Sequence, residues 1–140
     1  MNNERGSTQG GGGSFRRLLV GYDGSQDAQR ALRAATALAR DLNGEVHVLG
    51  AVRPPAHTEA PSEVAHVIDV ERDRLTRALA EAGSGGLPLH LVEGDDLAAA
   101  LAEHAERHGF DLVVVGAYGS HRGVAHELVL RHHPCPVVVV

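Results

Sequence analysis

At 140 residues the chain has the size of one domain and can bury a hydrophobic core without disulfides or metal ions. Hydrophobic residues make up 43% of it and aromatic residues only 3%, so we expect a core of Ala, Val and Leu. The net charge of −5, without a basic stripe, argues against a nucleic-acid partner, and no apolar run reaches the roughly 20 residues that span a bilayer.

The N-terminal segment 1–14 is expected to be a glycine-rich, disordered tail, because it has no apolar residue after Met1 and runs into four glycines. It also lacks the apolar stretch of a secretory signal. The single cysteine, Cys135, cannot form an internal disulfide, which is typical of a reducing compartment. We therefore expect a cytoplasmic protein with one domain at residues 15–140 and no membrane partner.

From residue 15 onward, short β-branched runs alternate with helical patterns, which indicates βαβ units. The first strand is predicted at Arg16–Tyr22, and Ser25 after it can cap a helix. Apolar residues at helical spacing continue this helix until Asn43-Gly44 ends it. The second strand is predicted at Glu45–Val52, and the Pro54-Pro55 pair then forces an extended exit from it.

The middle of the chain repeats this alternation. Ser62 can cap the second helix, which ends at the glycine-rich segment 83–86. The third strand is predicted at Leu87–Val92, and Asp95 or Asp96 is the natural cap of the third helix.

The most apolar run predicts a central strand at Phe110–Gly116. A fourth helix from about Val124 to His132 and a last strand at Pro136–Val140 follow it. Five strands and four helices, joined by right-handed crossovers, form a flavodoxin-like, doubly wound parallel sheet of the order 3-2-1-4-5. The sequence therefore predicts an α/β fold.

Three segments carry a resemblance to the universal stress protein family over nearly all of residues 15–140: RRLLVGYDGS, VEGDDLAAALAEHAERHGFDLVVVGAYG and ELVLRHHPCPVVVV. The resemblance implies a stress-response role and a homodimer that pairs the last strand, Pro136–Val140, across a two-fold axis. The family divides into ATP-binding and non-binding members. The binders carry Gly, two residues, Gly, nine residues, Gly and then Ser or Thr.

Only the first half of that motif is present. Gly116-Ala117-Tyr118-Gly119 reproduces its opening, but three residues instead of nine separate Gly119 from Gly123, and Val124 stands where a hydroxyl is expected. If Val124 fixes the alignment instead, Arg122 occupies the place of the third glycine. Glycine backbone and hydroxyl groups are what bind phosphate, so either alignment loses part of the triphosphate cradle.

In a doubly wound sheet, ligands bind at the carboxyl ends of the strands where the order reverses, here between the first and fourth strands. The resemblance places Asp23 near the nucleotide and Ala51 on its adenine side. A second interpretation of Asp23 stays open, in which it only braces the turn that follows the strand. The candidate nucleotide-binding residues are Asp23, Ser25, Ala51, Val115, Gly116, Gly119, Gly123 and Val124.

Two functions remain open. The first is a dimeric binding and regulatory module whose nucleotide site is reduced or lost, and the second is a regulator that binds ATP or another adenine nucleotide in this crevice. No catalytic residue is predicted, because the chain has no G-x-S-x-G elbow and no P-loop lysine. A slow ATPase would need a water-activating group that the sequence does not identify. ATP is the one cofactor considered.

Histidines are numerous, and His104 and His108 have the i, i+4 spacing by which two imidazoles can share a metal ion. No cysteine or carboxylate with ligand-like spacing completes a site. We interpret the pair as solvated side chains on the exposed face of a helix and predict no metal. His132, His133 and Cys135 are expected to have a structural role.

Overall fold

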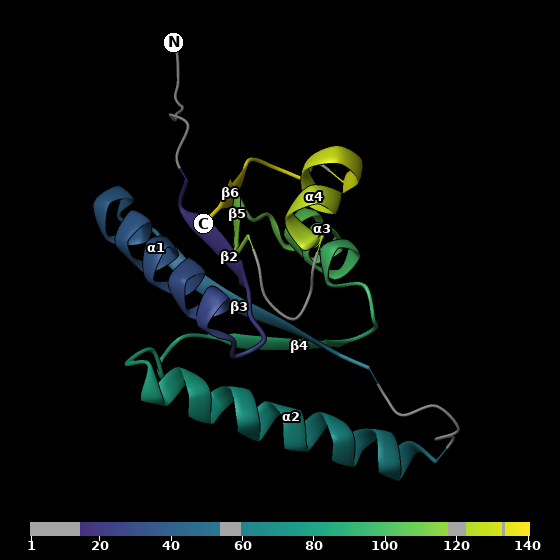
Figure 1. Cartoon of the computed structure of the whole chain (residues 1–140). Helices are drawn as coiled ribbons and strands as arrows, with labels where there is room; N and C mark the ends of the chain where they lie inside the picture. Colours follow the sequence, from purple (N-terminus) through teal and green to yellow (C-terminus); the bar gives the residue numbers. More distant parts are fainter. Residues whose placement is uncertain (1–14, 54–59, 118–122, 133) are drawn as a thin grey trace.

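A parallel sheet of five strands organises the computed structural model, which describes residues 15–53, 60–117, 123–132 and 134–140 (Figure 1). The strand order is β4-β3-β2-β5-β6, which confirms the predicted order 3-2-1-4-5. The predicted tail 1–14 and Gly119 lie outside the described residues. The strands span Arg17–Gly21 (β2), Glu45–Val52 (β3), Leu89–Glu93 (β4), Leu112–Val115 (β5) and Val137–Val139 (β6).

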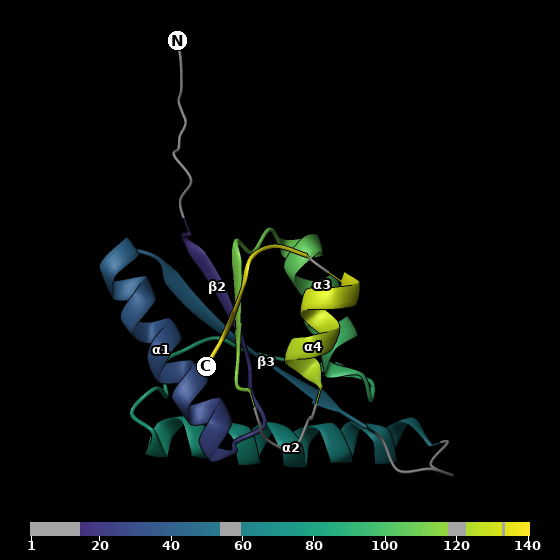
Figure 2. The same cartoon turned by 45° about the horizontal axis from the view of Figure 1, so that its top comes forward.

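Helices cover both faces of this sheet, as Figures 1 and 2 show. They span Gln26–Leu42 (α1), Pro61–Glu81 (α2), Leu97–His108 (α3) and Val124–Glu127 (α4), with a π-helical turn at Leu128–His132 (η1). Alternate side chains of each strand point to opposite faces. Leu18 and Val20 of β2 pack with α1 and α2, whereas Leu19 packs with α3. Each face therefore has its own hydrophobic cluster.

The ends of α1 and α3 follow the local signals in the sequence. Ser25 Oγ accepts a hydrogen bond from the Ala28 amide at 3.1 Å, and Asn43 ends α1 in the left-handed conformation at φ 57°. The Asp96 side chain accepts a bond from the Ala99 amide at 3.0 Å and so caps α3. Among the described helices, none is long and apolar enough to cross a membrane.

Several predicted boundaries differ in the structure. Strands β2, β5 and β6 are one or two residues shorter at each end than predicted, and β4 begins and ends later than the predicted Leu87–Val92. Two helices differ as well. The predicted Ser62 cap of α2 is wrong, because the helix begins at Pro61, after Ala60, and has no side-chain cap bond. Proline suits the first helical position, where its fixed φ is helical and its missing N–H is not needed. The predicted fourth helix also changes form, because α4 ends at Glu127 and continues as the π-helical turn.

Candidate functional site

The carboxyl ends of β2, β3 and β5 form one edge of the sheet. Val20 is in register with Val48 of β3 and Val114 of β5, and the Tyr22 amide donates to the Leu49 carbonyl oxygen at 2.9 Å. Since β2 lies between the other two strands, the residues just beyond these pairs meet at the same edge. Among the predicted residues, Asp23 and Gly116 lie just beyond the ends of β2 and β5, and Ala51 and Val115 lie in the last residues of β3 and β5.

Asp23 and Ser25 both hold the turn between β2 and α1. The Ser25 amide donates to Asp23 Oδ1 at 2.9 Å, and Ser25 Oγ caps α1. Gly24 between them has a φ of 84°, which side chains rarely tolerate. The turn-bracing role that the sequence left open for Asp23 is therefore present in the structure.

A side chain from α2 reaches the same turn. Arg74 donates from a terminal nitrogen to the Asp23 carbonyl oxygen at 3.1 Å, and Glu71 holds its guanidinium with two hydrogen bonds of 2.7 Å. The Glu71 hydrogen bond raises the pKa of Arg74 above its usual value. Arg74 is thus a fixed cation that joins α2 to the candidate crevice.

Tyr22 lies buried directly before Asp23. Its hydroxyl oxygen accepts a hydrogen bond from Gln29 Nε2 at 2.6 Å, which ties the end of β2 to the second turn of α1. Burial is the main cause that raises the pKa of Tyr22, and the Asp23 carboxylate adds to it, while the Gln29 hydrogen bond lowers it. Tyr22 therefore anchors the turn from below.

Gly116 has no room for a side chain. A Cβ atom built on it would lie 2.5 Å from Asp27 Oδ2 and 3.0 Å from the Asp27 backbone oxygen. Asp27 belongs to the first turn of α1, is only 7% exposed, and forms an ion pair with Arg30. A carboxylate is therefore packed directly against the first glycine of the shortened motif.

On the side of the sheet that α3 covers, the residues at these strand ends are apolar. Val115 is 3% exposed and belongs to the cluster under α3, against which Ala51 and Val124 also pack. Gly123 precedes α4 with a φ of 84° and provides no side-chain cap. The edge thus combines an apolar wall with a helix start that has no hydroxyl donor.

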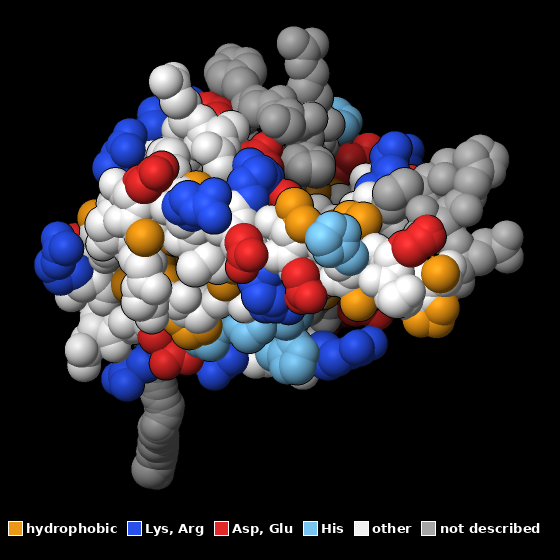
Figure 3. Space-filling model, turned by 90° about the horizontal axis from the view of Figure 1, so that it is seen from below, with side chains coloured by type: hydrophobic (Ala, Val, Ile, Leu, Met, Phe, Trp, Pro, Cys, Tyr) orange, Lys and Arg blue, Asp and Glu red, His pale blue; other side chains and the backbone are white. Residues whose placement is uncertain are grey.

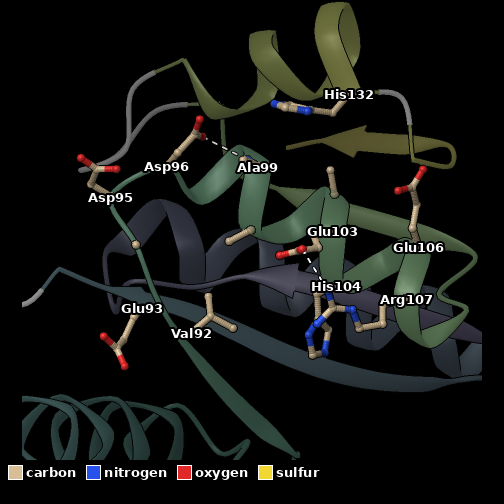
Figure 4. Close-up of a pocket in the computed structure, with 13 residues that line it drawn as sticks. Val92, Glu93, Asp95, Asp96, Ala99, Glu103, His104, Glu106, Arg107 and His132 are labelled. Atoms are coloured by element: carbon tan, nitrogen blue, oxygen red, sulfur yellow. Dashed lines mark hydrogen bonds and ion pairs between the residues drawn. The ribbon is translucent and has the colours of Figure 1, made fainter. Parts of the chain in front are cut away.

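A hollow of about 530 Å³ lies elsewhere, between the end of β4, the outer side of α3 and His132 of η1 (Figure 4). None of the seven predicted site residues that the structure describes lines it. Several of its charged groups already have partners, since Asp96 caps α3 and Glu103 pairs with Arg107 at 3.0 Å. Asp95 pairs with Arg53 at 3.5 Å. The hollow is therefore separate from the nucleotide crevice that the sequence predicts.

His104 is not the solvated side chain that its spacing suggested. It is half-buried between α3 and the sheet, with its ring centroid 4.8 Å from that of His90, while His108 is exposed. Burial and the neighbouring histidines lower the pKa of His104 to about 4. Within the described parts of the chain, no three His, Cys, Asp or Glu side chains converge on a metal position.

Cys135 is partly buried beside the cluster under α3. Burial raises the pKa of its thiol, and the Asp111 carboxylate raises it further. A nucleophilic cysteine needs the opposite, a lowered pKa that favours the thiolate. The surroundings of Cys135 thus favour the neutral, packed thiol.

The sequence did not indicate three residues that shape this edge: Asp27, Arg74 and Gln29. Asp27 carries a weak local signal, because an acidic residue in the first turn of a helix is a common favourable feature. Arg74 and Gln29 carry none, since their partners Asp23 and Tyr22 are set by how the helices pack on the sheet.

The doubly wound sheet, with its crevice residues at the reversal of strand order, defines a flavodoxin-like α/β domain. The model of the Universal stress protein family matches residues 14–140, and the chain belongs to this family. No curated protein matches the chain significantly.

Solved structures of the same family share the fold. A universal stress family protein from Burkholderia pseudomallei is 30% identical, with a TM-score of 0.67 over 93% of this chain and 98% of that one. A universal stress protein in complex with cAMP is 24% identical, with a TM-score of 0.64 over 91% and 97%. The universal stress protein from Archaeoglobus fulgidus in complex with dAMP is 21% identical, with a TM-score of 0.62 over 89% and 97%.

Proposed function

We propose that this chain is a cytoplasmic, homodimeric binding and regulatory module of the stress response, in which the nucleotide site is reduced. The start of α4 carries the proposal. Gly123 offers no side-chain hydrogen bond there, Val124 has no hydroxyl, and the helix is only four residues long before it changes to a π-helical turn. A triphosphate would find only part of the donor set that binds it in a glycine-rich cradle.

The charges at this edge also disfavour a triphosphate. Asp23 and Asp27 place two carboxylates beside the crevice. The described cations nearest to them already bind carboxylates, since Arg30 pairs with Asp27 and Arg74 with Glu71. Three phosphates would add negative charge beside these carboxylates, and Arg30 and Arg74 could bind them only by leaving the carboxylates with which they already pair.

A second candidate function is a regulator that binds an adenine nucleotide with fewer phosphates. The apolar wall of Ala51, Val115 and Val124 offers a surface on which a purine could pack. Two structural neighbours were solved with cAMP and dAMP, each of which has a single phosphate. Such a ligand needs less of the phosphate cradle than ATP does.

The nucleotide content of the purified protein and calorimetry distinguish the reduced-site module from the nucleotide-binding regulator. The purified protein is denatured and the released nucleotide is identified by mass spectrometry, and the protein is then titrated with ATP, AMP and cAMP. The reduced-site proposal expects no bound ATP and no heat of ATP binding at millimolar concentration. Stoichiometric ATP that survives purification would overturn it. A failure of all three ligands to bind would remove the second candidate.

A pair of variants locates any nucleotide binding in the crevice. Ala51→Leu fills the proposed adenine side, whereas Ala65→Leu adds the same side chain on the exposed surface of α2. If AMP or cAMP binds the crevice, A51L loses binding and A65L retains it. Equal binding by both variants would place the ligand elsewhere.

The proposed homodimer uses the exposed edge of β6. The carbonyl oxygens of Pro136 and Val140 accept bonds from the β5 side, and the Val140 amide donates to Val115. By alternation, the N–H and C=O groups of Val137 and Val139 point away from β5. An exposed row of this kind is suited to pairing with the same strand of a second copy.

A further inference from the structure

Two histidines from neighbouring strands stack on the face of the sheet that α3 covers. His47 of β3 and His90 of β4 have ring centroids 5.2 Å apart and planes that differ by 2°. His47 Nδ1 and His90 Nε2 are 3.0 Å apart, within hydrogen-bond distance. One of the two nitrogens must lack a proton to accept this bond, so the contact requires at least one neutral ring.

The row continues onto α3. The His104 ring centroid lies 4.8 Å from that of His90, and the His108 centroid lies 4.4 Å from that of His104. Phe110, just after the helix, contacts His47 and His104 at 5.1 and 5.6 Å between ring centroids. Three imidazoles thus lie where α3 meets β3 and β4, at a place where helices usually bury apolar side chains, and the exposed His108 extends the row.

Two arginines lie beside this row, and the two glutamates near it pair with these arginines. The Arg17 guanidinium of β2 lies 4.6 Å from the centre of the Phe110 ring, and Arg107 of α3 lies close enough to lower the pKa of His104. Glu45 is 3.2 Å from His47 Nε2 but also pairs with Arg17 at 3.2 Å. Glu103 pairs with Arg107. Figure 3 shows histidine side chains gathered at the surface with arginines beside them.

Each further proton on this row meets repulsion from other rings. Burial, followed by His47, His108 and Arg17, lowers the pKa of His90 below 6.5. Burial and the same kind of neighbours lower the pKa of His104 to about 4. Because the pKa is lowered while α3 is packed on the sheet, the rings bind more protons once α3 has detached. The contribution of the neutral rings to the packing of α3 is therefore present above pH 6.5 and is lost as the pH falls from there toward 4.

We propose that His90 and His104, which lie between His47 and His108 in this row, form a proton-sensitive clasp that holds the C-terminal half of α3 on β3 and β4 while these two rings are neutral and releases it as they protonate. Because His104 also lines the hollow beside α3, the clasp couples the shape of that hollow to pH. The proposal rests on the packing of α3 and is independent of nucleotide binding.

Hydrogen–deuterium exchange of the α3 amides, corrected for the intrinsic effect of pH, tests the clasp in the full chain. His104 alone, shifted from 6.5 to about 4, would raise the opening constant about 30-fold between about pH 7.5 and pH 5. Solvent screening of the partly exposed ring reduces this to about tenfold. We expect α1, which has no such row, to change much less.

His104→Phe keeps an aromatic ring that cannot be protonated, and His90→Gln is a second variant should the first fail to fold. In each variant, the increase in the opening constant of α3 between about pH 7.5 and pH 5 is expected to be at least threefold smaller than in the unaltered chain. His66→Gln, on the exposed face of α2, is the matched control and should keep the full dependence. The clasp is refuted if α3 protection is independent of pH, or if His104→Phe and His66→Gln respond alike.

Discussion

Contact between Gly116 and Asp27 is the tightest constraint at the candidate crevice. Gly116→Ala would place a methyl group against a buried carboxylate and the backbone of α1, neither of which can move without disturbing the helix start. We expect the free energy of unfolding to fall by about 1–3 kcal/mol. Urea denaturation measures this change.

The control for that variant is Gly86→Ala. Nothing lies within 4 Å of a Cβ atom at Gly86, and its φ is not in the left-handed region. We expect its effect on the unfolding free energy to stay within about 0.5 kcal/mol. If both variants lost the same free energy of unfolding, the contact with Asp27 would not be the cause of the loss in Gly116→Ala.

Cys135 provides a second prediction for a single residue. Because burial and Asp111 raise the pKa of its thiol, its thiolate fraction at neutral pH is lower than that of a free cysteine. We expect a thiol reagent to react with the folded protein at least tenfold more slowly than with a model cysteine peptide. Denaturant should remove the difference, and a fast reaction in the folded state would contradict the prediction.

The site residues illustrate what a sequence can indicate at this scale. Asp23 was predicted because it directly follows a strand, and the glycine pattern indicated Gly116. The contact that makes Gly116 necessary, with Asp27, lies 89 positions away in the chain and depends on how α1 packs on β5. Arg74 reaches Asp23 in the same way, through the placement of α2.

At the scale of helices, too, features set by nearby residues were predictable from the sequence and features set by distant contacts were not. Ser25, Asn43 and the pair Asp95 or Asp96, of which Asp96 is the cap in the structure, were predicted as helix ends, because each signal lies within three or four residues of the group that it satisfies. The prediction that Ser62 caps α2 was wrong, because Pro61 already lies in the first turn of this helix. The π-helical turn after α4 had no local signal, and the neighbouring cluster that buries Leu128 is formed by distant segments.

Two serines therefore make a matched pair. Ser25→Ala removes the hydrogen bond to the Ala28 amide at the start of α1 and should cost about 1 kcal/mol of unfolding free energy. Ser62→Ala, on the exposed first turn of α2, should leave stability within about 0.5 kcal/mol, since Ser62 caps nothing. Thermal denaturation compares them. If Ser62→Ala lost more unfolding free energy than Ser25→Ala, the conclusion that Ser25 caps a helix and Ser62 does not would be contradicted.

For the molecule as a whole, the sheet has two edges, β4 and β6, and the proposed dimer uses the second. Val139→Pro removes an outward N–H of β6 and leaves the bonds between Pro136, Val140 and β5 in place. Val139 is 45% exposed, so a proline ring has room there. At micromolar protein we expect sedimentation to give a dimer for the unaltered chain and a monomer for Val139→Pro.

Val139→Thr keeps the backbone N–H and nearly the same shape, and it should remain dimeric. A monomer for the unaltered chain would contradict strand pairing altogether. If Val139→Pro stays dimeric, the contact between copies uses another surface.

The order of the strands was predictable because the alternation of strands and helices, together with right-handed crossovers, leaves few arrangements. The reversal of strand order between β2 and β5, where the candidate crevice is predicted, follows from the same rule. The histidine row was not predictable, since its members come from β3, β4 and α3 and meet only after the sheet has formed.

Tyr22 gives this molecule an intrinsic optical probe. The chain contains no tryptophan and two tyrosines, so a Tyr118→Phe variant would leave Tyr22 as the single aromatic chromophore of its kind. Because the pKa of Tyr22 is raised, the midpoint of the rise in tyrosinate absorbance of the folded protein should lie above the ordinary value of 10.0. Its fluorescence would then report, without any label, on whether a ligand disturbs the turn that holds Asp23.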